Sequence, residues 1–475
     1  MRLLLLLLCL PSLTFAGHMS GNGVALSSHW IAYLSLAIFA LSILLVSFEE
    51  FIELRKSKPM LLSAGMIWAL IGLSAQGTHE AQLAEAAVRH SLLQYAELML
   101  FMLVVMTYIN AMTERRVFAA LRTWMSRRHY SYRQLFWLTG ISTFFLSPFL
   151  DNLSTALLMG AVVIATGREN LRFTGLACVN VVIASNAGGA YSPFGDITTL
   201  MVWQQDIMSL NGRVGFFTFF SLFIPSAANY LIPALFMHFA VPSGQLQSTQ
   251  EPVVMLRGAR RIIGLFLLTI ATAVCFQGLL HLPAVIGVLT GLSYLQFFGF
   301  YLKKTHKNHE AEVADEGTFT LPFVADSKRP FDVFLRVARA EWDTLLFLCG
   351  VILSVGGLGY LGLLSLASEV MYEQWGPTLA NVVVGLSSSV LENIPTMSAV
   401  LAMNPEMSMG QWLLVTLTAG VGGSLLSIGS AAGIALMGQS NGQYTFFTHL
   451  RWTPVIGIGY AISILLHISL NATLF

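Results

Sequence analysis

The stretch SPFLDNLSTALLMG, from Ser147 to Gly160, places an aspartate, an asparagine and two hydroxyl-bearing residues after Pro148 inside a long apolar run. The basic residues nearest to Asp151 along the chain are Arg133 and Arg168. Ionisable side chains within a membrane are costly, and they usually mark a substrate or ion pathway. If the surrounding chain lies in a membrane, this stretch predicts a functional site around Asp151.

The composition is that of a membrane protein. Hydrophobic residues make up 55% of the 475 residues and charged residues 10%, against about 25% charged residues in soluble proteins. We predict an all-α polytopic fold with about ten crossings of a hydrocarbon core that is about 30 Å thick. The predicted spans are 29–48, 60–76, 91–112, 173–203, 214–240, 262–280, 283–302, 342–364, 411–437 and 452–472.

The N-terminal segment and the cysteines limit other readings. Residues 1–16 combine Arg2 with a leucine-rich run and TFA before Gly17, which predicts a secretory signal, although an uncleaved first helix would fit as well. The four cysteines lie singly in apolar runs, without a CxxC pair. We therefore expect neither disulfides nor a bound metal cofactor, and nothing indicates a nucleic-acid partner.

The placement of Lys and Arg indicates the topology. Two further apolar segments, 134–167 and 376–403, are taken to return to the face from which they enter. With residue 29 outside, all but three of the 25 Lys and Arg residues then fall inside, as the positive-inside rule requires. The exceptions are Arg2, Arg89 and Arg213.

Charge does not separate a hairpin from a pair of crossings. Each arm of 376–403 has about 14 residues and would span roughly 21 Å as a helix, which is too short to cross. The arms of 134–167, about 17 residues each, are borderline. We expect re-entrant hairpins in both segments, with turns buried by protein or facing a wet cavity.

The opening stretch has a counterpart later in the chain. SPFLDNLSTALLM and SSVLENIPTMSAV match at one constant offset, and each is followed by a glycine-rich stretch, AGGAYSPFGD from Ala187 and VGGSLLSIGS from Val421. The matched pairs in the first two stretches are Ser147/Ser388, Asp151/Glu392, Asn152/Asn393 and Thr155/Thr396. The chain therefore contains an internal repeat.

The repeat predicts an inverted architecture. Residues 29–240 form the first half and 262–472 the second, joined by a cytoplasmic connector, 241–261. Each half has three spans, a hairpin, a glycine-interrupted span (173–203 or 411–437) and a final span, and a polar loop, 303–341, lies within the second half. Five crossings per half is an odd number, so the second half enters the membrane upside down. Inverted repeats with discontinuous helices are typical of secondary transporters.

The polar residues of the hairpin tips and helix breaks predict a cation site. Side-chain oxygens at the tips and backbone carbonyls near Asn186 to Gly189 would supply oxygen ligands, with Na⁺ at Asp151, Asn152 and Asp196. A buried acid can hold a proton or a cation, so the two compete for it, which is the minimal chemistry of an antiporter. The candidates are Asp151, Asn152, Ser154, Thr155, Asp196, Ser388, Glu392, Asn393, Thr396 and Ser427.

Two further polar residues lie in the span 91–112 or just before it. Glu97 is central in LLQYAELMLFML, and His90 lies two turns earlier on a similar face. A proton path or a pH sensor is one interpretation, because histidine titrates near neutrality. A hydrogen bond between helices is the other.

SPFLDNLSTALLM, SNAGGAYSPFGDITTLMVWQ and the long motif from GQWLLVTLTAG to PVIGIGY resemble NhaD-type sodium/proton antiporters of the ion transporter superfamily. The resemblance covers most of the chain from about residue 30. It implies Na⁺ or Li⁺ exchange for H⁺, a role in pH homeostasis, a bacterial inner membrane, a homodimer and elevator-type movement. Transferred by motif, the important positions are His90, Glu97, Asp151, Asn152, Asp196, Thr199, Glu341, Asp343, Ser388, Asn393, Ser427 and Ser430.

One position departs from the pattern. The family would have Asp before Asn393, and this chain has Glu392, whose extra methylene carries the carboxylate about 1.3–1.5 Å further. The departure bears on the choice between Li⁺ and Na⁺.

Three other functions were weighed. A sodium-coupled anion symporter of the same superfamily would keep the polar tips but lack the central acids. An intramembrane aspartyl hydrolase would need Asp151 and Asp196 to share a proton, and it gives no reason for the repeated hairpins. A passive channel is the third. We therefore predict a transporter, not an enzyme.

Overall fold

The computed structural model describes residues 29–52, 54–77, 80–126, 130–167, 170–244, 253–315 and 333–475. The expected signal segment, 1–16, lies outside these residues. Within them the chain is helical apart from a small antiparallel pair, β1 (Met208–Ser209) and β2 (Gly212–Arg213). Nine described helices are long and apolar enough to cross a membrane, which confirms an all-α polytopic protein.

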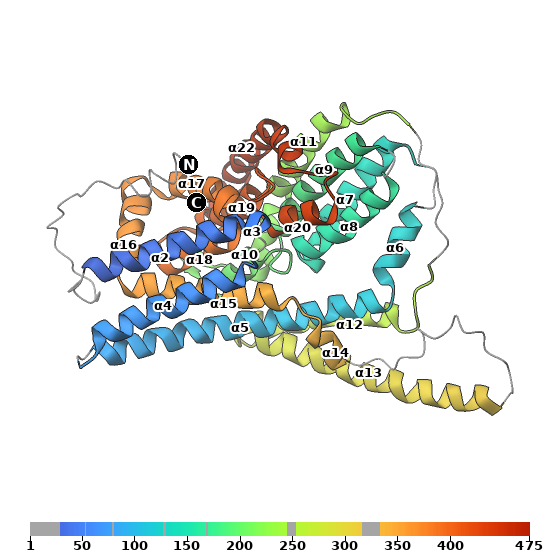
Figure 1. Cartoon of the computed structure of the whole chain (residues 1–475), viewed down its shortest axis with the longest axis horizontal. Helices are drawn as coiled ribbons and strands as arrows, with labels where there is room; N and C mark the ends of the chain where they lie inside the picture. The colour runs from blue at the N-terminus through green and yellow to red at the C-terminus, as the bar shows by residue number, and fades with distance from the viewer. Residues whose placement is uncertain are drawn as a thin grey trace.

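The helices form two layers (Figure 1). The first, here called the long-helix layer, consists of α2 (His29–Ser47), α4 (Ser57–Ala75), α5 (Glu80–Glu114), α12 (Ala259–Gly278), α13 (Ala284–Asp315) and α15 (Trp342–Tyr360). The second, here called the hairpin layer, consists of α7 (Tyr132–Leu150), α8 (Asn152–Thr166), α9 (Leu171–Gly189), α10 (Ile197–Gln204), η1 (Phe216–Leu222), α11 (Phe223–His238), α17 (Pro377–Leu391), α18 (Asn393–Met403), α19 (Met409–Gly422), α20 (Ala431–Gln439) and α22 (Thr453–Leu470).

Short helices connect or flank these elements. They are α3 (Glu49–Ile52), α6 (Val117–Ser126), α14 (Val333–Ala338), α16 (Leu363–Ser368), η3 (Glu369–Gln374), α21 (Phe446–Leu450) and η4 (Ala472–Leu474). The layers meet where α15 packs on α18 and α2 packs on α17. Aromatic contacts add to this interface, with the Phe101 and Phe194 rings 5.3 Å apart.

Local signals define the two hairpins. The Ser131 side chain and Gln134 form a capping box that starts α7, and Pro148 disrupts its hydrogen bonding just before it ends at Leu150. α7 packs on α8, and α17 packs on α18. With 15 and 11 residues, α17 and α18 are about 22 and 16 Å long, shorter than a hydrocarbon core of about 30 Å.

The helix bounds refine the predicted spans. The predicted span 173–203 is broken into α9 and α10, and 411–437 into α19 and α20. α9 is still one of the nine long apolar helices, but α19 and α20 are both too short, so nine such helices are found instead of ten. α13 continues to Asp315, so the first part of the predicted polar loop 303–341 is helical. Its Lys, Glu and Ala residues are good helix formers.

Candidate functional site

Each hairpin turns at an acid with an unusual backbone. Asp151 separates α7 from α8 with φ 66° and ψ 160°, and Glu392 separates α17 from α18 with φ 63° and ψ 150°. A residue with a side chain held in this region costs on the order of 1–3 kcal/mol, and such strain concentrates at functional sites. Both acids are buried.

The two acids use their carboxylates differently. Asp151 turns back onto its own helix, where Oδ1 accepts from the Ser154 N–H at 2.7 Å and Oδ2 from the Ser154 hydroxyl at 2.9 Å. It thereby caps the N-terminus of α8. The Glu392 carboxylate instead reaches across to the long-helix layer and pairs with Lys56, with Nζ and Oε1 2.9 Å apart.

The two broken helices also match each other. Asp196 caps α10 with φ −144° and ψ 148°, and Ser430 caps α20 with φ −140° and ψ 146°. Glycines allow the chain to fold back tightly before each cap. A Cβ on Gly189 would lie 2.6 Å from the Gly195 carbonyl oxygen, and a Cβ on Gly423 would lie 2.8 Å from that of Gly429.

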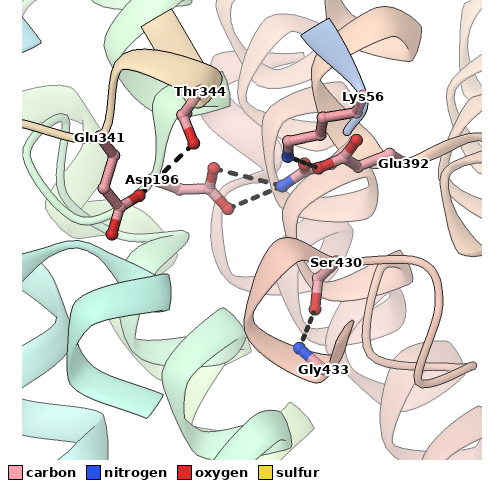
Figure 2. Close-up of polar contacts among 8 residues, drawn as sticks. Lys56, Asp196, Glu341, Thr344, Glu392, Ser430 and Gly433 are labelled. Carbon is pink, nitrogen blue, oxygen red and sulfur yellow. Dashed lines mark hydrogen bonds and ion pairs between the residues drawn. The ribbon is translucent and has the colours of Figure 1, made fainter. Parts of the chain in front are cut away.

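Side chains from both hairpin tips reach the Asp196 carboxylate, which Figure 2 shows close to Glu392 at the second tip. Asn152 Nδ2 donates to its Oδ2 at 2.9 Å, and Asn393 Nδ2 donates to the same oxygen at 3.0 Å and to Oδ1 at 3.2 Å. The Thr198 N–H donates to Oδ1 at 3.1 Å. The side chains of Asp196, Asn152 and Asn393 are buried, so both hairpin tips contribute a hydrogen bond to one acid.

A second chain of hydrogen bonds joins the first hairpin tip to both helix breaks. Asn152 Nδ2 also donates to Asn186 Oδ1 at 3.2 Å, and Asn186 Nδ2 donates to the Ser430 hydroxyl at 3.0 Å. Asp151 is close enough to Asp196 and Glu341 to interact with both electrostatically. The centre therefore combines two carboxylates, three amides and a hydroxyl.

The remaining predicted residues fall into two groups. Thr199, Ser388 and Thr396 donate to backbone carbonyls and hold the breaks in shape. Among the described residues, the buried hydroxyls of Thr155 and Ser427 have no hydrogen-bond partner. The second group thus leaves oxygen atoms near the breaks that a cation or water could use.

His90 and Glu97 lie apart from this centre. With Gln94 and Gln204, they line a cavity of about 150 Å³ between α5 and α10. His90 Nε2 is 3.1 Å from Gln94 Nε2. A cavity of this size holds a few water molecules, so both earlier interpretations, a proton path and a helix contact, remain predictions.

Glu341 and Asp343 lie at the start of α15, close to the centre. The Thr344 hydroxyl donates to Glu341 at 3.4 Å (Figure 2), and the Ser57 hydroxyl donates to Asp343 at 2.5 Å. Asp343 therefore joins α15 to α4 within the long-helix layer.

Two residues of the site were not predicted. Lys56 lies beside Arg55 and Lys58 in a basic cluster of the kind found at the membrane interface, and its partner Glu392 is far away in the sequence. None of the acids Asp151, Asp196 and Glu392 has a basic neighbour in the sequence. In the fold Glu392 does have one, which is Lys56. The side chain of Asn186 was also missed, although a polar amide in an apolar span directly before AGG is a signal that could have identified it.

Comparison with known proteins identifies the family of this chain. The family described as citrate transporter (CitMHS) matches residues 24–420. Proteins named Na(+)/H(+) antiporter NhaD from Vibrio cholerae and Alkalimonas amylolytica are each 54% identical to this chain, over 99% of its length and 98% and 97% of theirs. The protein of that name from Vibrio parahaemolyticus is 58% identical over 86% of this chain and 98% of its own. The chain therefore belongs to the NhaD family of antiporters, within the citrate transporter family.

Proposed function

We propose that this protein exchanges Na⁺ for H⁺ across the bacterial cytoplasmic (inner) membrane. The observation that carries the proposal is the buried Asp196 carboxylate, which both hairpin tips reach through Asn152 and Asn393. Asp151 lies near enough to add a second charge. The relatives named Na(+)/H(+) antiporter support the same pair of ions.

The chemistry follows from burial. A bare carboxylate is costly away from water, so it is stable only with a proton, a cation or sufficient hydrogen bonds. Na⁺ at Asp151, Asn152 and Asp196 would displace the proton, and the reverse step would release the cation. When a site with such competition opens alternately to the two faces of the membrane, the result is exchange.

The groups around Asp196 suit a small hard cation, which prefers oxygen ligands. Asn152 and Asn393 now direct their amide nitrogens at the carboxylate, but each amide also carries an oxygen. Rotation of these amides would offer that oxygen to Na⁺. The unpartnered hydroxyls of Thr155 and Ser427 could complete the ligand set.

We further propose an inverted repeat, with the hairpin layer moving against the long-helix layer as an elevator. The matched backbone angles at Asp151 and Glu392 support the repeat. So do equivalent bonds, because the Ser147 hydroxyl donates to the Ser185 carbonyl at 2.6 Å and that of Ser388 to the Ala419 carbonyl at 3.0 Å. The homodimer, Li⁺ as a second cargo and a role in pH homeostasis are proposals that rest on the family resemblance.

A sodium-coupled anion symporter is the second candidate, because the matching family is described as citrate transporter. A buried Lys56 would suit an anion, but Glu392 already neutralises it. The acids at Asp151 and Asp196 would repel a carboxylate substrate. Exchange therefore fits the charges of the site better than symport.

Everted membrane vesicles that hold a pH gradient test the proposal. Addition of Na⁺ should collapse the gradient with the wild type and fail to do so with Asp151→Asn. Glu85→Gln removes an exposed acid that pairs with Arg89 on α5, and it should behave as the wild type. A response that requires citrate as well as Na⁺ would favour the symporter instead.

A further inference from the structure

We propose that Lys56 is a positioning residue of the exchange cycle. It pairs with Glu392 and holds the second hairpin tip against the long-helix layer, and the pair opens whenever the hairpin layer leaves this position. The inference rests on the proposed exchange by movement of the hairpin layer.

The pair joins the two layers inside the protein. Lys56 directly precedes α4, and Glu392 is the turn between α17 and α18. The Lys56 side chain is 10% exposed and that of Glu392 4% exposed, so their 2.9 Å contact is shielded from water, in contrast to most surface ion pairs. The Lys56 ammonium also lies 4.6 Å from the centre of the Phe347 ring on α15.

Two other ion pairs of the described residues provide a contrast. Arg89 pairs with Glu85 on α5, and Arg213 pairs with Asp206 next to β1 and β2. Neither would be affected by a movement between the layers. The Lys56 pair would have to break in such a movement.

Glu392 and its counterpart Asp151 differ in side-chain length, and this difference gives them different partners. Both turns have nearly the same backbone angles, yet Asp151 is short and caps its own helix. The extra methylene of Glu392 carries its carboxylate to Lys56. A positive charge at that point disfavours a second cation nearby, so Asp151 and Asp196 remain as the acids that face the cargo.

The positive charge of Lys56 would still be balanced by nearby acids after the pair opens. Glu49, on α3 between α2 and α4, and Asp343 on α15 interact with it electrostatically. They would remain beside the ammonium when Glu392 moves away. The Lys56–Glu392 pair can therefore open without leaving an isolated buried ammonium, which would be strongly unfavourable.

The test measures exchange in proteoliposomes for Lys56→Gln, Glu392→Gln, the double variant and the charge swap Lys56→Glu/Glu392→Lys. Lys56→Gln leaves the buried Glu392 carboxylate without its partner and should lower the maximal rate at least about tenfold. Glu392→Gln leaves the ammonium beside Glu49 and Asp343 and should lower the rate less. The apparent KM for Na⁺ should stay within about threefold of the wild type, because the cargo acids are intact. The double variant and the swap should recover most of the rate, and so should Lys56→Arg.

A second measurement does not depend on transport. Na⁺ should raise the thermal stability of both the wild type and the purified double variant, and Asp196→Asn should lose this response. A double variant that is as inactive as Lys56→Gln, or that loses the Na⁺ response, would overturn the proposal and make Glu392 a cation ligand. Wild-type protein without Na⁺-dependent proton flux would refute the proposed function itself. This outcome is distinct, because the wild type would still be active if only the proposal about the Lys56–Glu392 pair were wrong.

Discussion

The strained turn at Asp151 allows stability and transport to be separated by one substitution. Asp151→Gly removes the carboxylate and should abolish exchange. It also relieves a backbone conformation, φ 66° and ψ 160°, that costs on the order of 1–3 kcal/mol with a side chain present. Glycine replaces an N-cap residue at a cost of only a few tenths of a kcal/mol, so the variant should gain roughly 1–2 kcal/mol of stability.

Asp151→Ala is the matched comparison. Alanine keeps the strain and loses the cap bonds from Ser154, which should cost about 1 kcal/mol. The two inactive variants should therefore differ by roughly 2–3 kcal/mol in stability, with glycine the more stable. Thermal melts of the purified proteins measure this order, and everted vesicles measure exchange.

Asn404→Gly serves as the control. Asn404 ends α18 with φ 44° and ψ 55° and is exposed, and asparagine tolerates this conformation at little cost. It should transport normally and melt near the wild type. An active Asp151→Gly would remove the carboxylate from the mechanism, and a glycine variant that melts below the alanine variant would refute the argument from strain.

Three further outcomes are expected. Ser430→Ala should lose about 1 kcal/mol of stability with the cap of α20, and it should raise the apparent KM for Na⁺ in flux assays because Asn186 loses its acceptor. Gly189→Ala should impair folding or transport, because its Cβ would meet the Gly195 carbonyl oxygen at 2.6 Å. Gly65→Ala, which has open space around it, should impair neither. Fluorescence-detected gel filtration and flux assays compare the two variants. In a cysteine-free background, Arg133→Cys should label only from the cytoplasm, and Gly376→Cys and Asn404→Cys only from outside; the reverse or mixed labelling would contradict the inverted repeat.

Much of this architecture could be predicted because the decisive signals are local. A lone acid in an apolar run identified Asp151, and the repeated glycine pairs identified both helix breaks. The hairpin bounds follow from the same runs, because α7 and α8 together cover 132–166 and α17 and α18 cover 377–403.

The contacts between distant segments could not be predicted in this way. Lys56 and Glu392 are 336 positions apart, and each has an ordinary local reading, one as an interfacial lysine and the other as a second cation ligand. Nothing within either stretch specifies the other, since only the packing of α2 on α17 and α15 on α18 brings them together. The helical part of 303–341 was missed for another reason: its polarity suggested a loop, although its residues favour a helix.

The division of Lys56 and Glu392 between two layers has an electrical consequence. If the hairpin layer moves, it carries Glu392, Asp151 and Asp196 with it and leaves the lysine behind. The net charge of the hairpin layer then depends on whether it holds a proton or Na⁺. It also lacks the positive charge of Lys56, which balances Glu392 while the pair is closed. Each elementary charge that crosses the full membrane potential changes the energy by about 2.3 kcal/mol per 100 mV. The placement of one ammonium on the stationary layer would therefore make the rate of exchange depend on voltage.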